Sequence, residues 1–352
     1  MYFILRRDLI PTNITFAINR KRITGADLDT CNKWTVCGTD LGIPFLLENR
    51  AVGFLFGDTF STYQPEGPDN NGGVDHRSPV MLRSHSQPST DSVIWDNAAG
   101  LGGDGMAPEL FGTRDGEFTR IPNDGIAFPE TKQQIISFMS INRWKDLPPN
   151  KPPPANNAGW QTNYAGLAYS DNGNTFHRTD LKWPNHDDNL DPFQMWSMQR
   201  FNEFVYIFSV RAGRVYGPMM LRRVRWDRMF FPNEYQCWGN NVWGPPGTCT
   251  PLFEDWISEP SVRRLDDGTW VMAYLNPTLH SIVTRTATGP EQKWSNSKIQ
   301  LTEIQESALY GGFIHPYSSS RPNDLHLMVS TWKKDNNGRT TQYHVSHYSG
   351  SV

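Results

Sequence analysis

The sequence has no apolar run near the roughly 18 residues that a helix needs to cross a bilayer. Charged residues make up only 20% of its 352 residues, and Ala, Leu, Glu and Lys dominate no segment. This composition excludes a coiled coil and a helix bundle. The net charge of −3 lacks the basic excess that is typical of nucleic-acid-binding proteins. We therefore expect neither a membrane nor a nucleic acid as a partner, and the oligomeric state stays open.

A secretory signal peptide is also missing. The first residues are MYFIL, and Arg6, Arg7 and Asp8 interrupt this stretch before it reaches the length of a signal-peptide core. Either a signal was removed before this sequence begins, or the protein leaves its cell by lysis or on a phage particle. The expected location is therefore extracellular, virion-associated or released at lysis.

Cysteine is scarce, with four residues in the chain. Cys31 and Cys37 lie six positions apart, and Cys237 and Cys249 lie twelve apart. Two short-range pairs predict two local disulfides and an oxidising destination. Zinc binding is disfavoured because no Cys-x-x-Cys or His-x-x-x-His accompanies them. Four free buried thiols are the remaining alternative.

Turn-forming and aromatic residues are abundant, with 29 Gly, 26 Pro and 13 Trp. Apolar residues alternate at period two between turns rich in Gly, Pro, Asn and Asp, and no amphipathic helix exceeds two turns. Five groups of such strands begin near Asp40, Asp124, Met195, Glu259 and Gly312. Serial sheets of this kind predict an all-β fold, a five-bladed β-propeller.

The propeller is expected to occupy residues 31–352 as a single catalytic domain, with residues 1–30 as a tail or a ring-closing segment. Two stretches rich in Gly, Asn and Pro, Tyr63–Asp75 and Leu147–Gly159, are expected to be surface loops. A linker between domains is the alternative for the second. The segment Tyr169–Phe176 approximates an Asp-box, a hairpin turn of propeller blades that lies away from the active centre. It therefore supports the fold and not the chemistry.

Ligands of a propeller bind at a mouth of the central channel, where the inner strands begin. The residues expected at these openings are Asp40, Asp124, Met198, Gln199, Glu259 and His315. Carboxylates and a histidine that converge on one opening are costly unless they bind or react with something. For Asp124 the alternative is turn chemistry, since it lies in Asn-Asp-Gly. Glu259 and His315 are candidate substrate-binding residues.

The sharpest signal is the pair Asp40 and Asp58. Two apolar strands flank the turn Glu48-Asn49-Arg50, and residues that pair across this hairpin have numbers that sum to 98. Asp40 and Asp58 meet that condition, so we expect their Cβ atoms about 5 Å apart. Two close carboxylates suit glycoside hydrolysis with retention of configuration. Turn capping and a divalent cation such as calcium are the alternatives, and no other cofactor is expected.

Four further residues are candidates for substrate binding. His76 and Arg77 open the next strand of the same blade, and Arg77 is suited to hydrogen-bond sugar hydroxyls or to orient an aspartate. Trp160 and Asn163 follow the Pro-rich stretch, and an aromatic ring with an amide is a common sugar-binding pair. The alternatives are a surface charge for Arg77 and a core position for Trp160.

With these motifs the sequence resembles glycoside hydrolase family 183, which is built on the domain catalogued as unknown-function domain 4185. The similar blocks are Thr39–Gly42, Phe56–Phe60, His76–Val80, Glu259–Val262 and Gly311–Pro316. The resemblance implies a five-bladed propeller that acts as an endo-D-arabinanase on α-1,5-linked D-arabinofuranose chains of mycobacterial arabinogalactan and lipoarabinomannan. The family's two essential aspartates correspond to Asp40 and Asp58. The missing signal peptide suggests a phage-encoded member.

Two other functions remain open at this point. One is a non-catalytic carbohydrate-binding propeller, for example a phage receptor-binding protein that uses the same mouth. The other is a sialidase-like hydrolase, which the Asp-box suggests but which needs three arginines near the channel axis. Release of oligosaccharides from purified arabinogalactan distinguishes the hydrolase from the binding protein.

Overall fold

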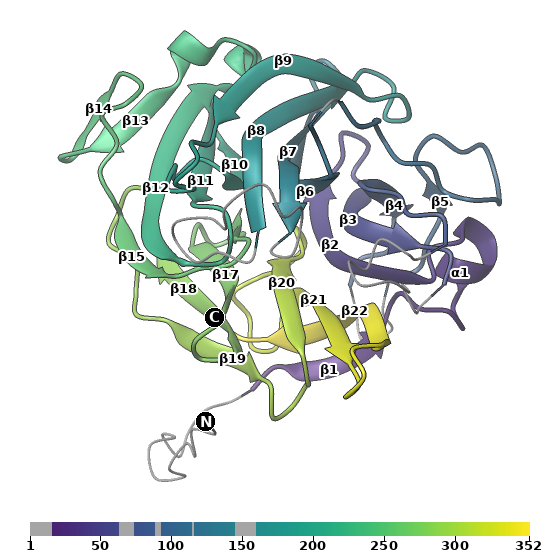
Figure 1. Cartoon of the computed structure of the whole chain (residues 1–352). Coiled ribbons are helices and arrows are strands. Elements are labelled where there is room, and N and C mark those ends of the chain that lie inside the picture. The colour runs from purple at the N-terminus through teal and green to yellow at the C-terminus, as the bar shows by residue number, and fades with distance from the viewer. Residues whose placement is uncertain (1–15, 63–73, 89–92, 115, 145–159) are drawn as a thin grey trace, which may run out of the picture.

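The structure is a computed structural model, and it describes residues 16–62, 74–88, 93–114, 116–144 and 160–352. Its strands form five sheets around a central channel, so the predicted all-β fold and five-bladed propeller are confirmed (Figure 1). Leu147–Gly159 and residues 63–73 of the other predicted loop lie outside the described residues.

The five blades follow one another along the chain, each beginning with its innermost strand. Blade 1 contains β2 (Gly38–Leu46), β3 (Val52–Phe60), β4 (Val80–Ser84) and β5 (Asn97–Ala98). Blade 2 contains β6 (Thr119–Phe128), β7 (Gln133–Trp144), β8 (Trp160–Ser170) and β9 (His177–Pro184). Blade 3 contains β10 (Met195–Phe201), β11 (Phe204–Val210) and β12 (Tyr216–Arg225), with β13 (Gln236–Gly239), β14 (Val242–Gly244) and β15 (Phe253–Trp256) outside them.

Blade 4 contains β16 (Ser261–Arg264), β17 (Trp270–Asn276), β18 (Ser281–Ala287) and β19 (Lys298–Thr302). Blade 5 combines both ends of the described chain. Its strands are β20 (Leu309–Ile314), β21 (Leu325–Lys334), β22 (Thr340–Gly350) and β1 (Ile18–Arg22). The antiparallel pairing of β1 with β22 therefore closes the ring.

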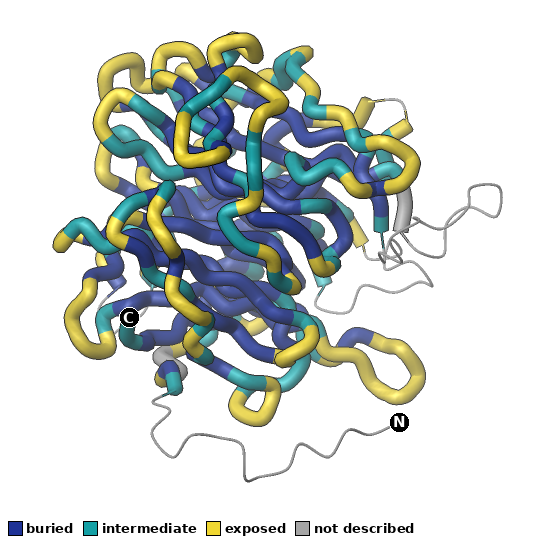
Figure 2. The backbone as a smooth tube through the Cα atoms, turned by 90° about the vertical axis from the view of Figure 1, so that its left-hand side faces the viewer, coloured by how far each residue is buried: buried dark blue, intermediate teal, exposed yellow. Residues whose placement is uncertain are grey.

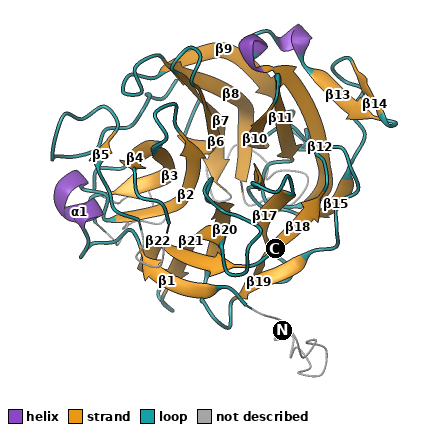
Figure 3. Ribbon diagram, turned by 180° about the vertical axis from the view of Figure 1, so that it is seen from behind, coloured by secondary structure: helices purple, strands orange, loops and turns teal. Residues whose placement is uncertain are grey.

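Helical structure is minor and peripheral (Figure 3). In the part of the chain that the structure describes, it comprises α1 (Asp29–Trp34) and two short 3₁₀ turns, η2 (Trp226–Arg228) and η3 (Pro232–Glu234). Within the described residues, no helix has the length and apolar character to span a membrane.

The core lies between the faces of neighbouring sheets. Strand residues of all five blades are buried there, while exposed residues concentrate in the turns between strands (Figure 2). Large side chains such as Phe54, Trp196 and Trp270 are fully buried in this core. Since neighbouring blades cover both faces of a sheet, strands such as β2 and β17 are buried along nearly their whole length instead of at alternate residues.

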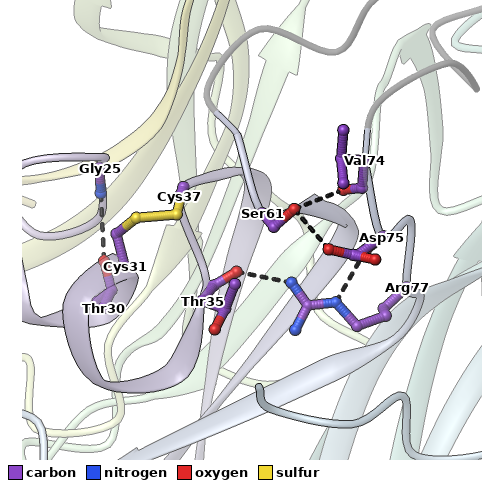
Figure 4. Close-up of a disulfide and its surroundings, with 9 residues drawn as sticks. All are labelled: Gly25, Thr30, Cys31, Thr35, Cys37, Ser61, Val74, Asp75 and Arg77. Carbon is purple, nitrogen blue, oxygen red and sulfur yellow. Dashed lines mark hydrogen bonds between the residues drawn. A yellow bond between two sulfur atoms is a disulfide. The ribbon is translucent and has the colours of Figure 1, made fainter. Parts of the chain in front are cut away.

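Both predicted disulfides are present. Cys31–Cys37 joins α1 to the segment that enters β2, and Cys237–Cys249 joins β13 to the loop before β15 (Figure 4 shows the first). No free cysteine remains in the chain.

The five inner strands contact one another in a ring, in the order β2, β6, β10, β16 and β20. Residues at the beginnings of β2, β6 and β20 and just before β16 line one pocket. Residues at the other ends of these strands line a second cavity. The inner strands therefore run in one direction, and the channel has a first mouth where they begin and an opposite mouth where they end.

Candidate active site

The pocket at the first mouth contains four of the residues that the sequence analysis selected. It is lined by Asp40, Leu41, Asp58, Ile121, Met139, Ile141, Trp160, Glu259 and Tyr310. Its free volume is about 10 Å³, which is near the minimum that holds one water molecule. The cavity at the opposite mouth is larger, about 490 Å³, but no Asp or Glu lines it. Of these two cavities, only the one at the first mouth is therefore lined by carboxyl groups, in spite of its smaller volume.

The β2–β3 hairpin carries both aspartates but does not pair them directly. Thr39 pairs with Thr59 and Leu41 pairs with Phe56, so Asp40 lies opposite two residues of β3, Gly57 and Asp58. A second bulge at Gly42 restores the expected register. The prediction of direct cross-strand partners is therefore wrong, because a pair of compensating bulges interrupts the ladder. The carboxyl separation, and the retaining mechanism deduced from it, no longer follow from the register.

Left-handed backbone conformations produce the bulge. Leu41 has φ of 61° and Gly42 has φ of 73°. Gly57 leaves the space that the Asp40 side chain fills, since a Cβ at position 57 would lie 2.4 Å from Asp40 Oδ1. The bulge thus turns the carboxyl of Asp40 across β3 instead of along the sheet face.

Asp40 is buried, with 3% of its surface exposed. Its Oδ2 accepts a hydrogen bond of 2.8 Å from the hydroxyl of Tyr343, and its Oδ1 has no hydrogen-bond partner in the described structure. Burial raises the pKa of Asp40 well above its usual value, and the nearby charge of Asp58 raises it further. Asp40 is therefore suited to hold a proton near neutral pH.

Asp58 has a different environment, at the partly exposed side of the pocket. Its Oδ1 accepts hydrogen bonds from His76 Nε2 (2.8 Å) and from Thr119 Oγ1 (3.0 Å). The ring of Phe60 packs against the imidazole of His76 with centroids 5.2 Å apart. His76, expected to contact substrate, is thus placed as the residue that orients Asp58.

Glu259 precedes β16 and is almost fully buried in a bidentate ion pair with Arg214. The Arg214 guanidinium also lies 3.9 Å from the ring centroid of Tyr310. Since Glu259 raises the pKa of Arg214, this arginine stays charged, and its charge opposes the rise in the pKa of Asp40. Glu259 therefore lines the pocket, but its negative charge is balanced by the ion pair with Arg214.

Arg77 lies elsewhere. It is buried, and its guanidinium donates to the carbonyl oxygens of Thr35 (2.6 Å), Ala107 (2.6 Å) and Asp75 (3.0 Å) (Figure 4 shows the bonds to Thr35 and Asp75). The alternative prediction, that Arg77 is a surface charge, is also wrong, because the side chain is buried. Arg77 instead joins β4 to the end of α1 and to the loop before β6.

Asn163 is likewise outside the pocket. Its Nδ2 donates to the carbonyl of Gly116 and to Ser140 Oγ, each at 3.0 Å. The predicted aromatic–amide pair is therefore divided, since Trp160 lines the pocket and Asn163 fastens a loop of blade 2.

His315 follows β20 instead of opening it, so it lies toward the opposite mouth and is buried. The sequence analysis placed the beginning of the fifth strand group near Gly312, in Gly311-Gly312, with His315 at the opening of its inner strand. These glycines lie within β20, where a Cβ on Gly312 would meet Ile282 at 2.7 Å. Close approach between blades 4 and 5 explains the glycine, and the strand begins at Leu309.

Asp124 is also displaced from the mouth. It lies in the middle of β6, fully buried, and pairs with Arg263 of blade 4 while it accepts bonds from Ser197 Oγ and the Met198 N–H. It therefore links three blades inside the channel. Met198 and Gln199, also expected at the first mouth, line the cavity at the opposite mouth.

The sequence analysis missed Tyr310, which lines the pocket, and three residues that hydrogen-bond to its acidic side chains, namely Tyr343, Arg214 and Thr119. Thr119 and Tyr310 lie near the beginnings of β6 and β20. The sequence analysis placed the beginnings of these two strand groups too late, near Asp124 and Gly312. Arg214 and Tyr343 reach the pocket from a loop and from the third strand of a blade, and no local motif marks them. Within the described ranges, no group of three or more His, Cys, Asp or Glu side chains is placed to hold a metal ion.

Two curated relatives from Aspergillus match this chain over nearly its full length. Notoamide biosynthesis cluster protein J' of Aspergillus versicolor is 46% identical over 99% of this chain and 96% of its own. Notoamide biosynthesis cluster protein J of Aspergillus sp. (strain MF297-2) is also 46% identical, over 99% and 94%. The comparisons lend no support to a phage origin.

Solved structures share the fold at low sequence identity. A putative hydrolase from Bacteroides ovatus has a TM-score of 0.59 at 12% identity, over 90% of this chain and 86% of its own. The α-L-arabinofuranosidase PaAbf62A of Podospora anserina, solved with cellotriose, has a TM-score of 0.51 at 11% identity, over 96% and 98%. The model of the family described as a domain of unknown function, DUF4185, matches residues 25–349, and the chain therefore belongs to this family.

Proposed function

We propose that the protein is a glycoside hydrolase with Asp40 as the general acid and Asp58 as the base or nucleophile. The observation that carries this proposal is a buried carboxyl with a raised pKa beside a second, more accessible carboxyl in one pocket. Environments that separate the pKa values of two carboxyl groups are typical of the acid and base of such enzymes. The fold neighbours include a hydrolase and an arabinofuranosidase, which agrees with this chemistry.

The proposed step moves one proton and breaks one bond. Asp40 transfers the proton of its Oδ1 to the leaving oxygen while the bond from that oxygen to the anomeric carbon breaks. Asp58 attacks that carbon or deprotonates the water that does so, and His76 and Thr119 hold its Oδ1 during this step. Proton NMR of the first-formed anomer distinguishes the two courses.

The proposed substrate is an α-1,5-linked D-arabinofuranose chain, cleaved internally. The support is membership of the DUF4185 family together with the two aspartates at the positions that the resemblance implies. Action outside the cell is part of this proposal, and the two disulfides agree with an oxidising destination. A sialidase activity is disfavoured, because it needs three arginines near the channel axis. The arginine that contacts the lining residue Tyr310 is Arg214, and its charge is neutralised by the ion pair with Glu259.

The experiment is hydrolysis of purified mycobacterial arabinogalactan and of an aryl arabinofuranoside, with product analysis. Asp40→Asn and Asp58→Asn should each fold normally and lose at least about 100-fold in kcat/KM, because acid–base assistance is typically worth 10²–10⁴-fold. Asp104→Asn, at an exposed loop position, is the matched control and should keep full activity. Cleavage that survives either pocket substitution above about a tenth of the native rate would contradict the assigned roles.

A second candidate substrate is a glycosylated small molecule of a biosynthetic gene cluster. The observation that favours it is the 46% identity, over 99% of this chain, to proteins named for notoamide biosynthesis clusters. The same two aspartates would act in both cases. Release of sugar from a small glycoside, with no cleavage of arabinogalactan, would select this substrate.

A further inference from the structure

Exposed aromatic side chains are rare in this protein. Of the Phe, Tyr and Trp residues whose side-chain exposure the structure describes, only Tyr216, Phe231 and Trp256 are exposed, with exposed fractions of 47%, 50% and 39%. Two of the three, Tyr216 and Trp256, are direct cross-strand partners of β12 and β15. Their exposure is thus concentrated at one place on the surface.

The pair forms a braced platform. The ring centroids of Tyr216 and Trp256 lie 6.1 Å apart with planes at 63°. The Tyr216 hydroxyl donates to Glu254 Oε2 at 3.2 Å, and Arg211 donates to the Tyr216 carbonyl at 3.4 Å. On the other side of β15, Asp255 accepts bonds from Tyr274 and Arg285 of blade 4. The strand that carries Trp256 is therefore fixed before any ligand arrives.

Short chain connections join this platform to the pocket. Trp256 precedes Glu259 by three residues, so their Cα atoms lie within about 10 Å. Tyr216 follows Arg214 by two residues, and Arg214 and Glu259 form the ion pair beside Tyr310. These short connections keep the platform near the first mouth, outside the lining of the pocket.

Within the described residues, the free volume of the pocket is about that of one water molecule. We therefore expect the rings of a bound glycan to rest around the pocket, with the bond to be cleaved facing the carboxyl groups. Flat apolar rings beside a carboxylate match a sugar, which has apolar C–H faces and hydroxyl donors at its edge. The charge of Glu254 disfavours an anionic chain.

We propose that Tyr216, Trp256 and Glu254 form a distal subsite that binds a sugar ring of a neutral glycan chain while a bond elsewhere in that chain lies at Asp40 and Asp58. The inference rests on the proposed function, because the occupant is the rest of the same substrate. It adds the prediction that the preferred substrate is a chain and not a single glycoside.

The test compares Tyr216→Ala, Trp256→Ala and the matched control Phe231→Ala, which truncates the third exposed aromatic ring. Binding is measured by retardation in native gels that contain mycobacterial arabinogalactan, with polygalacturonate as the anionic probe. Kinetics are measured on arabinogalactan and on an aryl arabinofuranoside. Each platform variant should weaken retardation and raise KM for the polymer by roughly three- to tenfold, with kcat and the aryl substrate unchanged. Phe231→Ala should behave as the native protein.

The outcomes separate this proposal from the proposed function. If the native protein hydrolyses neither substrate but is retarded in a way that depends on Tyr216 and Trp256, the result would support the subsite and contradict the hydrolase. Activity with equal kinetics in all variants would support the hydrolase and overturn the subsite. Three other results would also overturn the subsite. They are stronger retardation by polygalacturonate, no retardation by either polymer, and variants that change only the oligomeric state on gel filtration.

Discussion

Asp40 is the residue on which the proposed chemistry depends, and its properties come from its neighbours. Burial favours its neutral form, the hydroxyl of Tyr343 donates to Oδ2, and Gly57 provides the room for Oδ1. Ionising a buried carboxyl is costly, so the site is expected to reduce stability as Asp40 loses its proton. The position and the protonation of this carboxyl can each be tested by one substitution.

Substitution of Gly57 by Ala should displace the Asp40 carboxyl. The added Cβ would lie 2.4 Å from Asp40 Oδ1, closer than any non-bonded contact allows. We expect kcat/KM to fall by at least about tenfold and the free energy of unfolding by about 1–3 kcal/mol. Gly102→Ala, where no atom lies within 4 Å of the new Cβ, is the control and should change neither. Native kinetics in the Gly57 variant would contradict the assigned position of the carboxyl.

Substitution of Asp40 by Asn should stabilise the protein increasingly as pH rises. The folded state binds the Asp40 proton more tightly than the unfolded state, whose Asp titrates near about pH 3.9. Between that pH and the raised folded pKa, the unfolded state has lost the proton, so the contribution of Asp40 to stability falls with pH. Melting temperatures of the Asp40→Asn variant and the native protein, measured from about pH 4 to pH 8, should differ by an amount that grows with pH. A constant difference would contradict a raised pKa.

At the scale of elements, the first blade is fastened by polar contacts rather than by its strands alone. Its outer strand β5 has two residues, and α1 is only six residues long. The Cys31–Cys37 disulfide and the three bonds of the Arg77 guanidinium hold α1, the entry to β2 and the loop before β6 in contact (Figure 4 shows the disulfide and the bonds to Thr35 and Asp75). Because His76 is the neighbour of Arg77, this brace also fixes the partner of Asp58.

Arg77→Met should therefore lower stability rather than substrate affinity. The change leaves the buried carbonyl of Ala107 and the partly buried carbonyl of Thr35 without their donor, at a cost of about 2–4 kcal/mol in the free energy of unfolding. Denaturant unfolding measures this loss, and Arg321→Met, at an exposed side chain, is the control. A raised KM with unchanged stability would restore the initial expectation that Arg77 binds sugar hydroxyls.

At the scale of the whole molecule, the channel depends on a closed ring. The strand β1 completes blade 5 by pairing with β22, and β22 carries Tyr343, the donor to Asp40. Asp124 and Arg263 link blades 2 and 4 across the interior, so the ring is also tied through its centre. Stability of the ring and geometry of the site are thus coupled through blade 5.

A chain that begins at residue 25 lacks β1 and should be less stable. The loss of β1 removes the four paired positions between β1 and β22 and exposes the edge of β22. We expect it to lower the free energy of unfolding by about 2–4 kcal/mol. Activity should fall as well, since Tyr343 lies in β22. A chain that begins at residue 16 keeps β1 and is the matched control. Equal melting temperatures for the two chains would show that β1 does not stabilise the ring.

The architecture could be predicted because it follows from local patterns. Period-two alternation with turn residues identified the five strand groups, and short cysteine spacing identified both disulfides. The beginnings of strands were less certain, as Gly311-Gly312 shows, since glycine marks either a turn or a close approach of two backbones. This one ambiguity moved His315 from one end of the channel to the other.

The sequence by itself determined the fold class, the hairpin that carries Asp40 and Asp58, and the gathering of Trp160 and Glu259 at the same mouth, because these depend on residue order and strand direction. Only the tertiary structure decided that Asp40 lies in a bulge, that Tyr343 and Arg214 complete the pocket, and that Arg77 is a brace. The physical reason is distance along the chain. A bulge is set by left-handed residues packed against other blades, and Asp40 meets Tyr343 across 303 positions, which no local pattern encodes.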